Sequence, residues 1–429
     1  MQKLKQIIPM FLPLILVFYH IYPQALDVAG SSFIFLSGLL GLALYAYHKF
    51  PFKETLMVIS SLLGLLFIFY TSGWLNERDD PYTFGYIKSQ VAWFFSAYLI
   101  IFTIYKIHKR PSFNTLLLYI AIAIGLQAVI TFGMNMDESI HDFFFSIQMQ
   151  VEYTEDIMEE GGQQRLMGYG IAFFGAGAVS GIGLILISYL LMRMKLNKKG
   201  FIALAALYVF TFYIGLFMAR TTIIGAAIGF LVIGVLYIWD HRSERKQARA
   251  FFVSAVFLMA GGYTLAMFYF PSFSDWAFEL FINFMRTGKL QTRSSDGLDE
   301  MFLIPKDLHT LIFGRGRMIF YGTDVGYSRM LFWVGVPGTL AFFLYQMFIV
   351  KLSYTKDWAV NIMPISIFVY TLVLNIKGWI DLNLILYLFF FYFMFYKYYI
   401  YMPTRNLEIK TMGAIRHENR LKENGLYRK

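Results

Sequence analysis

The arginines of one long polar stretch are the residues of this chain best suited to chemistry. Between Phe270 and Arg329 the sequence interrupts a series of apolar runs. The cations of this stretch are Arg286, Lys289, Arg293, Lys306, Arg315, Arg317 and Arg329. Guanidinium groups bind phosphate through paired hydrogen bonds, and neighbouring glycines let backbone N–H groups approach the same anion. We therefore predict a site for an anionic ligand.

Three short segments carry the candidate residues of this stretch. They are residues 290–296 (LQTRSSD), 312–317 (IFGRGR) and 323–329 (TDVGYSR). We predict that Arg293 takes part in catalysis. The predicted substrate-binding residues of the other two segments are Arg315, Arg317, Tyr327 and Arg329. The alternative is that these cations neutralise the acidic residues 135–169, where Arg165 stands almost alone as a cation and is a further substrate-binding candidate.

Arg220 is the most distinctive single residue. It lies where two apolar runs meet with almost no connector, in Met218-Ala219-Arg220-Thr221. Arginines at membrane depth are rare and commonly mark a ligand or ion pathway. The alternative is a turn residue whose charged end reaches the interface. We predict an unpaired guanidinium with a catalytic role.

Asp324 is the candidate general base. A carboxylate in this polar segment could accept a proton from a sugar hydroxyl, or it could orient Arg329. The seven histidines have no ligand spacing, and the chain has no cysteine, P-loop or GxGxxG turn. We therefore expect neither a metal nor a cofactor.

The elements that must position these residues are membrane-spanning helices. Of the 429 residues, 58% are hydrophobic and 15% are charged, which exceeds the norms of soluble domains. We predict an all-α polytopic membrane protein with about twelve spans of the length a bilayer requires. The predicted spans are Ile7–Tyr22, Ala29–Tyr47, Leu56–Trp74, Val91–Tyr105, Leu116–Met134, Gly170–Leu191, Phe201–Met218, Thr221–Trp239, Phe251–Phe270, Met330–Val350, Ile362–Leu374 and Leu382–Ile400.

Lysines and arginines gather in alternate connections between these spans. They fall on one side if both termini are cytoplasmic, as the positive-inside rule requires. This distribution explains the net charge of +10 through topology and lipid headgroups, so we expect no nucleic-acid partner. The predicted division is a transmembrane domain over residues 1–402 and a basic cytoplasmic tail over 403–429.

Two outer loops follow, over residues 135–169 and 271–327, the larger one between the ninth and tenth spans. Within the larger loop, Phe273–Met285 has the periodicity of an amphipathic helix that ends near Gly288. This helix would either lie in the membrane interface or pack over the ends of the spans. A second short helix is predicted from Asp296 to Leu303.

The order of these features resembles the O-antigen polymerase and ligase superfamily of bacterial envelopes. The resemblance rests on the arginine at a tight turn, the Arg-Ser-Ser of the long loop, Leu-Ile-Phe-Gly-Arg-Gly-Arg, Thr-Asp-Val-Gly-Tyr-Ser-Arg, and a span that begins Met-Leu-Phe-Trp-Val-Gly-Val-Pro-Gly. It covers the whole topology and, in residues, roughly 202–340.

The resemblance implies a membrane-embedded glycosyltransferase with a GT-C-like arrangement. Such enzymes act on the periplasmic side of the bacterial inner membrane on sugars linked to undecaprenyl diphosphate. In position, Arg220, Arg293, Arg315 and Arg329 match the anion-binding arginines of the family. Ligases usually carry a histidine where this chain has Asp324, so the resemblance favours a polymerase of O-antigen lipopolysaccharide, capsule or exopolysaccharide. A flippase and a chain-length regulator are possible partners.

Two other classes of protein stay open. A transporter or flippase of lipid-linked sugars typically has repeated halves and charges at mid-membrane. Here the charges gather at the outer ends and no repeat is visible. A scaffold protein of an export complex is the third alternative.

Overall fold

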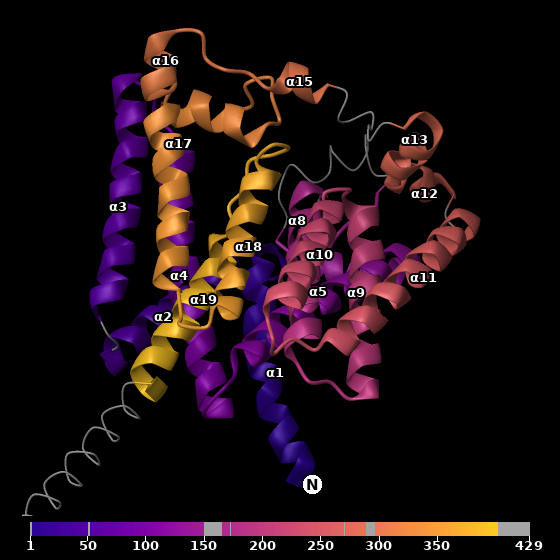
Figure 1. Ribbon diagram of the computed structural model, residues 1–429. Coiled ribbons are helices and arrows are strands. Elements are labelled where there is room, and N and C mark those ends of the chain that lie inside the picture. The colour runs from indigo at the N-terminus through magenta and orange to yellow at the C-terminus, as the bar shows by residue number, and fades with distance from the viewer. Residues whose placement is uncertain are drawn as a thin grey trace, which may run out of the picture.

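The computed structural model is a bundle of helices (Figure 1). It describes residues 2–49, 52–149, 165–171, 173–269, 271–288 and 297–401. The predicted catalytic Arg293, the predicted N-cap Asp296 and the predicted basic tail 403–429 lie outside these residues.

Within the described residues, seven helices are long and apolar enough to cross a membrane. They are α3 (Phe52–Leu75), α4 (Pro81–His108), α5 (Phe113–Met136), α8 (Phe173–Arg193), α9 (Lys198–Met218), α10 (Thr222–Trp239) and α17 (Gly326–Leu352). A helix satisfies its own backbone hydrogen bonds, as hydrocarbon demands. The all-α, multi-pass membrane class is therefore confirmed.

The other five predicted spans also coincide with helices. These are α1 (Gln2–Ile21), α2 (Phe33–His48), α11 (Arg245–Tyr269), α18 (Trp358–Leu374) and α19 (Asn383–Phe395), the last continued by a π-helical turn over Tyr396–Tyr401. Three of them, α2, α18 and α19, are shorter than the roughly 20 residues that a perpendicular span needs. Twelve crossings therefore stay a prediction.

Helix α8 forms the centre of the bundle and is buried along most of its length. Small residues allow its backbone to approach that of α10 closely. A Cβ added to Gly225 would lie 2.1 Å from the Cα of Gly181. At the upper end of α8 in Figure 1, a Cβ on Gly177 would lie 2.7 Å from the Cβ of Ala219. This contact fixes the start of the turn between α9 and α10.

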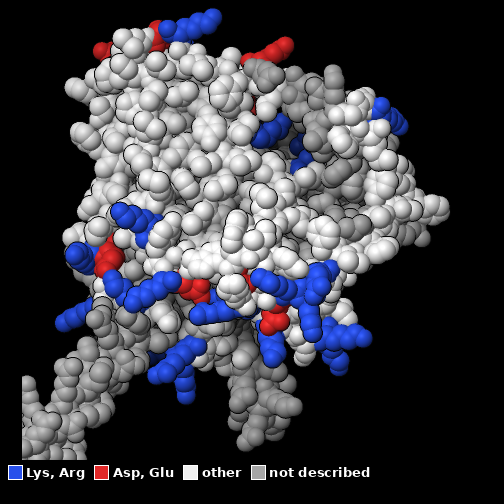
Figure 2. Space-filling view, in the orientation of Figure 1, with Lys and Arg blue, Asp and Glu red and all other residues white. Residues whose placement is uncertain are grey.

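The two ends of the bundle differ in charge. The band of Lys and Arg at the lower edge of Figure 2 lies at the end from which α1 begins in Figure 1. At this end Arg193 donates to Asp240 (2.5 Å) and Asp357 (2.8 Å), and so links α8 to the end of α10 and the start of α18. The opposite, upper end carries α6 (Glu138–Ile147), α12 (Pro271–Ala277), α13 (Glu279–Thr287), α15 (Leu298–Met301) and α16 (Leu308–Phe313).

The predicted amphipathic helix is present as two helices. The chain leaves helical geometry at Phe278 (φ −97°, ψ 9°), which separates α12 from α13. The Phe278 ring packs on Tyr263 of α11 and on Tyr213 of α9, with centroid distances of 4.8 Å and 6.3 Å. These contacts favour packing over the spans, the second of the two alternatives. The predicted end at Gly288 is confirmed, because Gly288 caps α13 in the left-handed region (φ 72°).

Other local elements differ from the prediction. The predicted helix from Asp296 to Leu303 is α15, which covers Leu298–Met301 within the described residues. The sequence analysis missed α6, α16 and a short antiparallel pair, β1 (Asp27–Val28) with β2 (Ser31–Ser32). The pair is too short to show a strand periodicity.

Candidate functional site

The tight turn between α9 and α10 holds Arg220 at the upper end of the bundle. Ala219 is extended, and α10 begins at Thr222. The carbonyl of Arg220 accepts a hydrogen bond from the backbone N–H of Ile223 at 3.0 Å. Because this bond begins the first turn of α10, the position of Arg220 is set by the helix itself.

The guanidinium of Arg220 is paired, contrary to the prediction. Its Nη1 lies 2.5 Å from Oε2 of Glu279, the first residue of α13. Its Cζ lies 4.6 Å from the centroid of the Trp276 indole, a cation–π contact. The side chains of Arg220 and Glu279 are 16% and 17% exposed, so solvent reaches the pair. An anion that binds the Arg220 guanidinium must therefore compete with the Glu279 carboxylate for it.

Arg165 is brought beside Arg220 by backbone contacts. The N–H of Leu166 donates to the carbonyl of Phe217, near the end of α9, at 3.1 Å. The Arg165 Cζ lies 4.8 Å from the centroid of the Trp276 indole. Burial lowers the pKa of Arg165, and the charge of Arg220 lowers it further. Two guanidinium groups thus share one indole, and each repels the other.

Lys377 is a third cation at this place, and the sequence analysis did not select it as a site residue. It follows α18, in a turn where a Cβ on Gly378 would lie 2.9 Å from the Phe174 ring of α8. Burial lowers the pKa of Lys377, the charge of Asp324 raises it, and those of Arg220 and Arg165 lower it. A lysine in a connection of seven residues between two predicted spans was the available signal.

We name Arg165, Arg220 and Lys377 the cationic cluster. Two carboxylates act on it: Glu279 forms an ion pair with Arg220, and Asp324 interacts electrostatically with Lys377. The five groups carry three positive and two negative charges. Figure 2 shows Lys and Arg atoms recessed in the upper part of the molecule, apart from the basic band at the lower edge. A net charge of +1 over these five groups suits an anion with several acceptor oxygens.

Arg315 and Arg317 lie elsewhere at the upper end, beside α3. The guanidinium of Arg315 lies 5.0 Å from the Phe332 ring centroid and 5.7 Å from that of Tyr321. Arg315, Arg317 and Arg78 all act electrostatically on Tyr321. Arg315 is therefore placed against aromatic rings other than Trp276, the indole that Arg165 and Arg220 share.

The glycines around Arg315 serve packing, which corrects their predicted role. The N–H groups of Arg315 and Gly316 donate to the carbonyls of Phe332 (2.6 Å) and Trp333 (3.0 Å) in α17. These carbonyls precede Gly335, where α17 leaves helical geometry (φ 67°, ψ −174°) and loses its internal partners. The backbone of the Gly-Arg-Gly segment completes the kinked helix instead of binding an anion.

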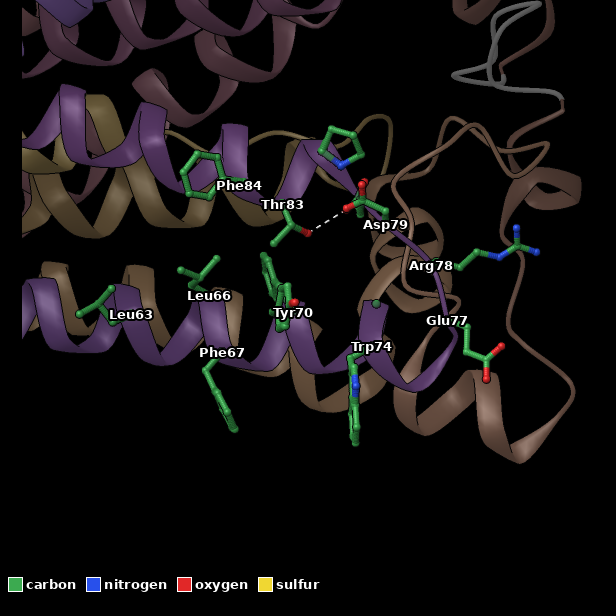
Figure 3. Close-up of a pocket in the computed structure, with 14 residues that line it drawn as sticks. Leu63, Leu66, Phe67, Tyr70, Trp74, Glu77, Arg78, Asp79, Thr83 and Phe84 are labelled. Carbon is green, nitrogen blue, oxygen red and sulfur yellow. Dashed lines mark hydrogen bonds between the residues drawn. The ribbon is translucent and has the colours of Figure 1, made fainter.

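A groove runs between α3 and α4, and Arg78 is one of the residues that line it. Figure 3 shows Leu66 and Tyr70 of α3 facing Thr83 of α4, with Glu77 and Arg78 at the connecting turn. Its volume is about 810 Å³. Asp80 closes its upper end, where it accepts hydrogen bonds from Thr83 (2.7 Å) and from the Trp333 indole (2.8 Å). The apolar walls suit a lipid chain better than a sugar.

Tyr327 and Arg329 belong to the start of α17. The Tyr327 hydroxyl donates to the carbonyl of Leu372 at 2.7 Å, which joins α17 to α18, so its phenol is engaged in helix packing. Arg329 Nε is buried without a hydrogen-bond partner among the described residues. No ion pair links Arg329 to Asp324, although both are described, so the predicted orienting contact is absent.

Asp324 itself is exposed, directly after the buried Thr323. Thr323 anchors the segment, because its hydroxyl donates to Met301 of α15 at 2.5 Å and accepts from the N–H of Val325 at 3.0 Å. The backbone that carries the carboxylate is therefore anchored, and the carboxylate itself is exposed and interacts electrostatically with Lys377.

No group of three or more metal-ligating side chains occurs in the described ranges. We compared the chain with models of protein families, with curated proteins and with solved structures, and none of the three comparisons gave a match. The site is therefore argued from its own geometry.

Proposed function

We propose that the protein polymerises oligosaccharide repeat units carried on undecaprenyl diphosphate. The observation that carries this proposal is the cationic cluster, where Arg165 and Arg220 meet at the Trp276 indole and Lys377 interacts electrostatically with both. A diphosphate offers several anionic oxygens to such a cluster. The resemblance to O-antigen polymerases in the sequence around Arg220 and Asp324 supports the same reading.

In the proposed reaction, a hydroxyl oxygen of the acceptor sugar attacks the anomeric carbon of the donor. The bond between that carbon and the diphosphate oxygen breaks, and its electron pair leaves with the diphosphate. The cations stabilise the charge that develops there, so the leaving group needs no proton. Asp324 accepts the proton of the attacking hydroxyl.

This proposal places the upper end of the bundle on the periplasmic side of the bacterial inner membrane. Both termini would then be cytoplasmic, at the end that carries the basic band. Twelve crossings, including short spans for α2, α18 and α19 that local thinning of the bilayer accommodates, complete the proposed topology. A lipid-linked oligosaccharide, the bilayer, a flippase and a chain-length regulator are the proposed partners, and no metal or cofactor is invoked.

A deletion mutant tests the proposal directly. We expect its surface polysaccharide to collapse on a gel from a ladder to one short band, because single repeat units still reach the acceptor. Loss of a ligase would leave lipid-linked polymer that is not transferred. Loss of a flippase would strand lipid-linked units on the inner leaflet. Either of these two results would contradict polymerisation.

A further inference from the structure

A second pocket at the upper end lies between the first turns of α4 and the turn that joins α18 to α19. Its volume is about 640 Å³, within the range typical of small-molecule sites. The residues that matter for its chemistry are Tyr82, Gly85, Tyr86, Ser89, Trp379 and Asp381. The sequence analysis and the proposed reaction assign no function to it.

Aromatic rings form one wall and are held in fixed orientations. The Trp379 ring lies edge-to-face with Tyr82 at 5.6 Å and with Tyr86 at 5.8 Å. Its indole N–H points to the sulfur of Met330 at 3.0 Å. Tyr82 is 37% exposed, so an aromatic surface remains accessible. The accessible Tyr82 ring suits stacking against the apolar face of a ring-shaped ligand, while Tyr86 is buried behind it.

Hydrogen-bonding groups form the other wall. Asp381 accepts from the side chain of Gln90 and from the N–H of Asn383, each at 3.2 Å. A carboxylate has about four acceptor positions, so after these two bonds and the interaction with the Tyr86 hydroxyl one position is left for a ligand hydroxyl. Gln90 is fixed in turn, because its Oε1 accepts from Asn383 (3.1 Å) and Tyr387 (2.8 Å).

The pocket is connected to the cationic cluster through one short turn. Lys377 of the cluster, Trp379 and Asp381 alternate along it. The side chain of Asn375 holds the turn closed, because its Nδ2 donates to the carbonyl of Ile380 at 2.8 Å. A ligand in the pocket would therefore lie near an anion bound at the cluster.

We propose that this pocket binds a sugar ring at the end of the acceptor chain, which places the acceptor beside the donor diphosphate. This inference rests on the proposed function and adds the site of the second substrate. A prenyl or acyl chain is a poorer occupant, because it would cover Asp381 and Ser89 without offering them a hydrogen bond. A sugar satisfies both walls at once.

Blocking the pocket with a side chain gives the sharpest test. A Cβ added to Gly85 meets no atom within 4 Å, so Gly85→Leu is accommodated by α4 while its side chain enters the pocket. Gly234→Leu in α10 is the matched control, because its Cβ is equally unobstructed and lies outside the pocket. Asp381→Asn is the second variant, which keeps the size of the side chain.

Binding is measured on purified protein in nanodiscs, with a lipid-free oligosaccharide of one repeat unit as the probe and saturation-transfer NMR as the readout. We expect Gly85→Leu and Asp381→Asn each to weaken binding tenfold or more. Gly234→Leu should match the wild type. Donor binding, measured with undecaprenyl diphosphate, should be unchanged in all three variants.

Equal oligosaccharide binding by Gly85→Leu and Gly234→Leu would overturn the pocket assignment, and so would the absence of binding in the wild type. Loss of co-purified lipid from Gly85→Leu with sugar binding intact would also overturn it. Failure of the proposed polymerisation has a different signature, since the wild type would then make no polymer from lipid-linked units, whatever the variants bind.

Discussion

The net charge of the cationic cluster and its two carboxylates distinguishes an electrostatic role of Arg220 from a structural one. The wild-type groups sum to +1 with Arg165, Arg220, Lys377, Glu279 and Asp324 charged. Arg220→Ala lowers the sum to 0 and leaves the Glu279 carboxylate without this partner. The double variant Arg220→Ala/Glu279→Ala restores +1. Glu279→Gln raises the sum to +2 and keeps every guanidinium.

The expected effect of Arg220→Ala on diphosphate affinity follows from Coulomb's law. Two unit charges at 4 Å interact by about 4 kcal/mol at an effective dielectric constant of 20. The Arg220–Glu279 pair is partly exposed, so solvent screening reduces this to roughly 2–3 kcal/mol, or about thirty- to 150-fold in affinity. Arg220→Ala should weaken diphosphate binding by that factor. Glu279→Gln should strengthen it, and the double variant should lie between Arg220→Ala and the wild type.

The assay is binding of undecaprenyl diphosphate to each purified variant at two salt concentrations, with polymer synthesis measured in parallel. Arg220→Lys should recover part of the affinity, because an ammonium keeps the charge but loses the planar pair of donors. If Arg220 serves only to hold α13 in place, Glu279→Gln should weaken binding as much as Arg220→Ala does. That result would refute the electrostatic reasoning.

Three further predictions concern other parts of the chain. Gly316→Ala should lower stability more than Gly322→Ala. Both glycines have positive φ, which costs about 1–2 kcal/mol for alanine. Of the two, only the Cβ at Gly316 would meet backbone atoms, 2.6 Å from the Cα of Gly73. Melting in detergent measures the difference, and equal melting temperatures would contradict it. If Asp324 is the base, Asp324→Asn should reduce polymer synthesis about a hundredfold without weakening donor binding, and near-normal synthesis would exclude this role. Reporter fusions at Lys198 and Gly288 should score on opposite sides of the membrane, and a shared side would refute the proposed orientation.

The long apolar helices could be predicted from the sequence because the signals that define each of them are local. A span must satisfy its own backbone and match the bilayer in length, and both demands can be read in a window of about twenty residues. The same holds for the left-handed cap at Gly288 and for the turn that carries Arg220. These features depend on neighbours a few positions away.

The grouping of charged residues could not be predicted, because it depends on contacts between distant segments. Arg220 pairs with a residue 59 positions away, and a backbone bond from Leu166 to Phe217 places Arg165 beside it. Conversely, Arg315 has the residue type and glycine neighbours of an anion site. The backbone N–H groups of Arg315 and Gly316, however, donate to carbonyls of the kinked α17, and no local sequence pattern reveals these contacts.

The position of Lys377 shows why such a site is built on helix ends and not within a long loop. The like charges of Arg165, Arg220 and Lys377 repel each other, and burial lowers the pKa of Arg165 and of Lys377. A flexible loop would relax by moving the cations apart. Here each cation is held by a rigid element: Arg220 by the first turn of α10, Lys377 by the turn after α18 and Arg165 by the end of α9. Packing of the spans therefore maintains the repulsion, and an anionic ligand that enters the cluster relieves it.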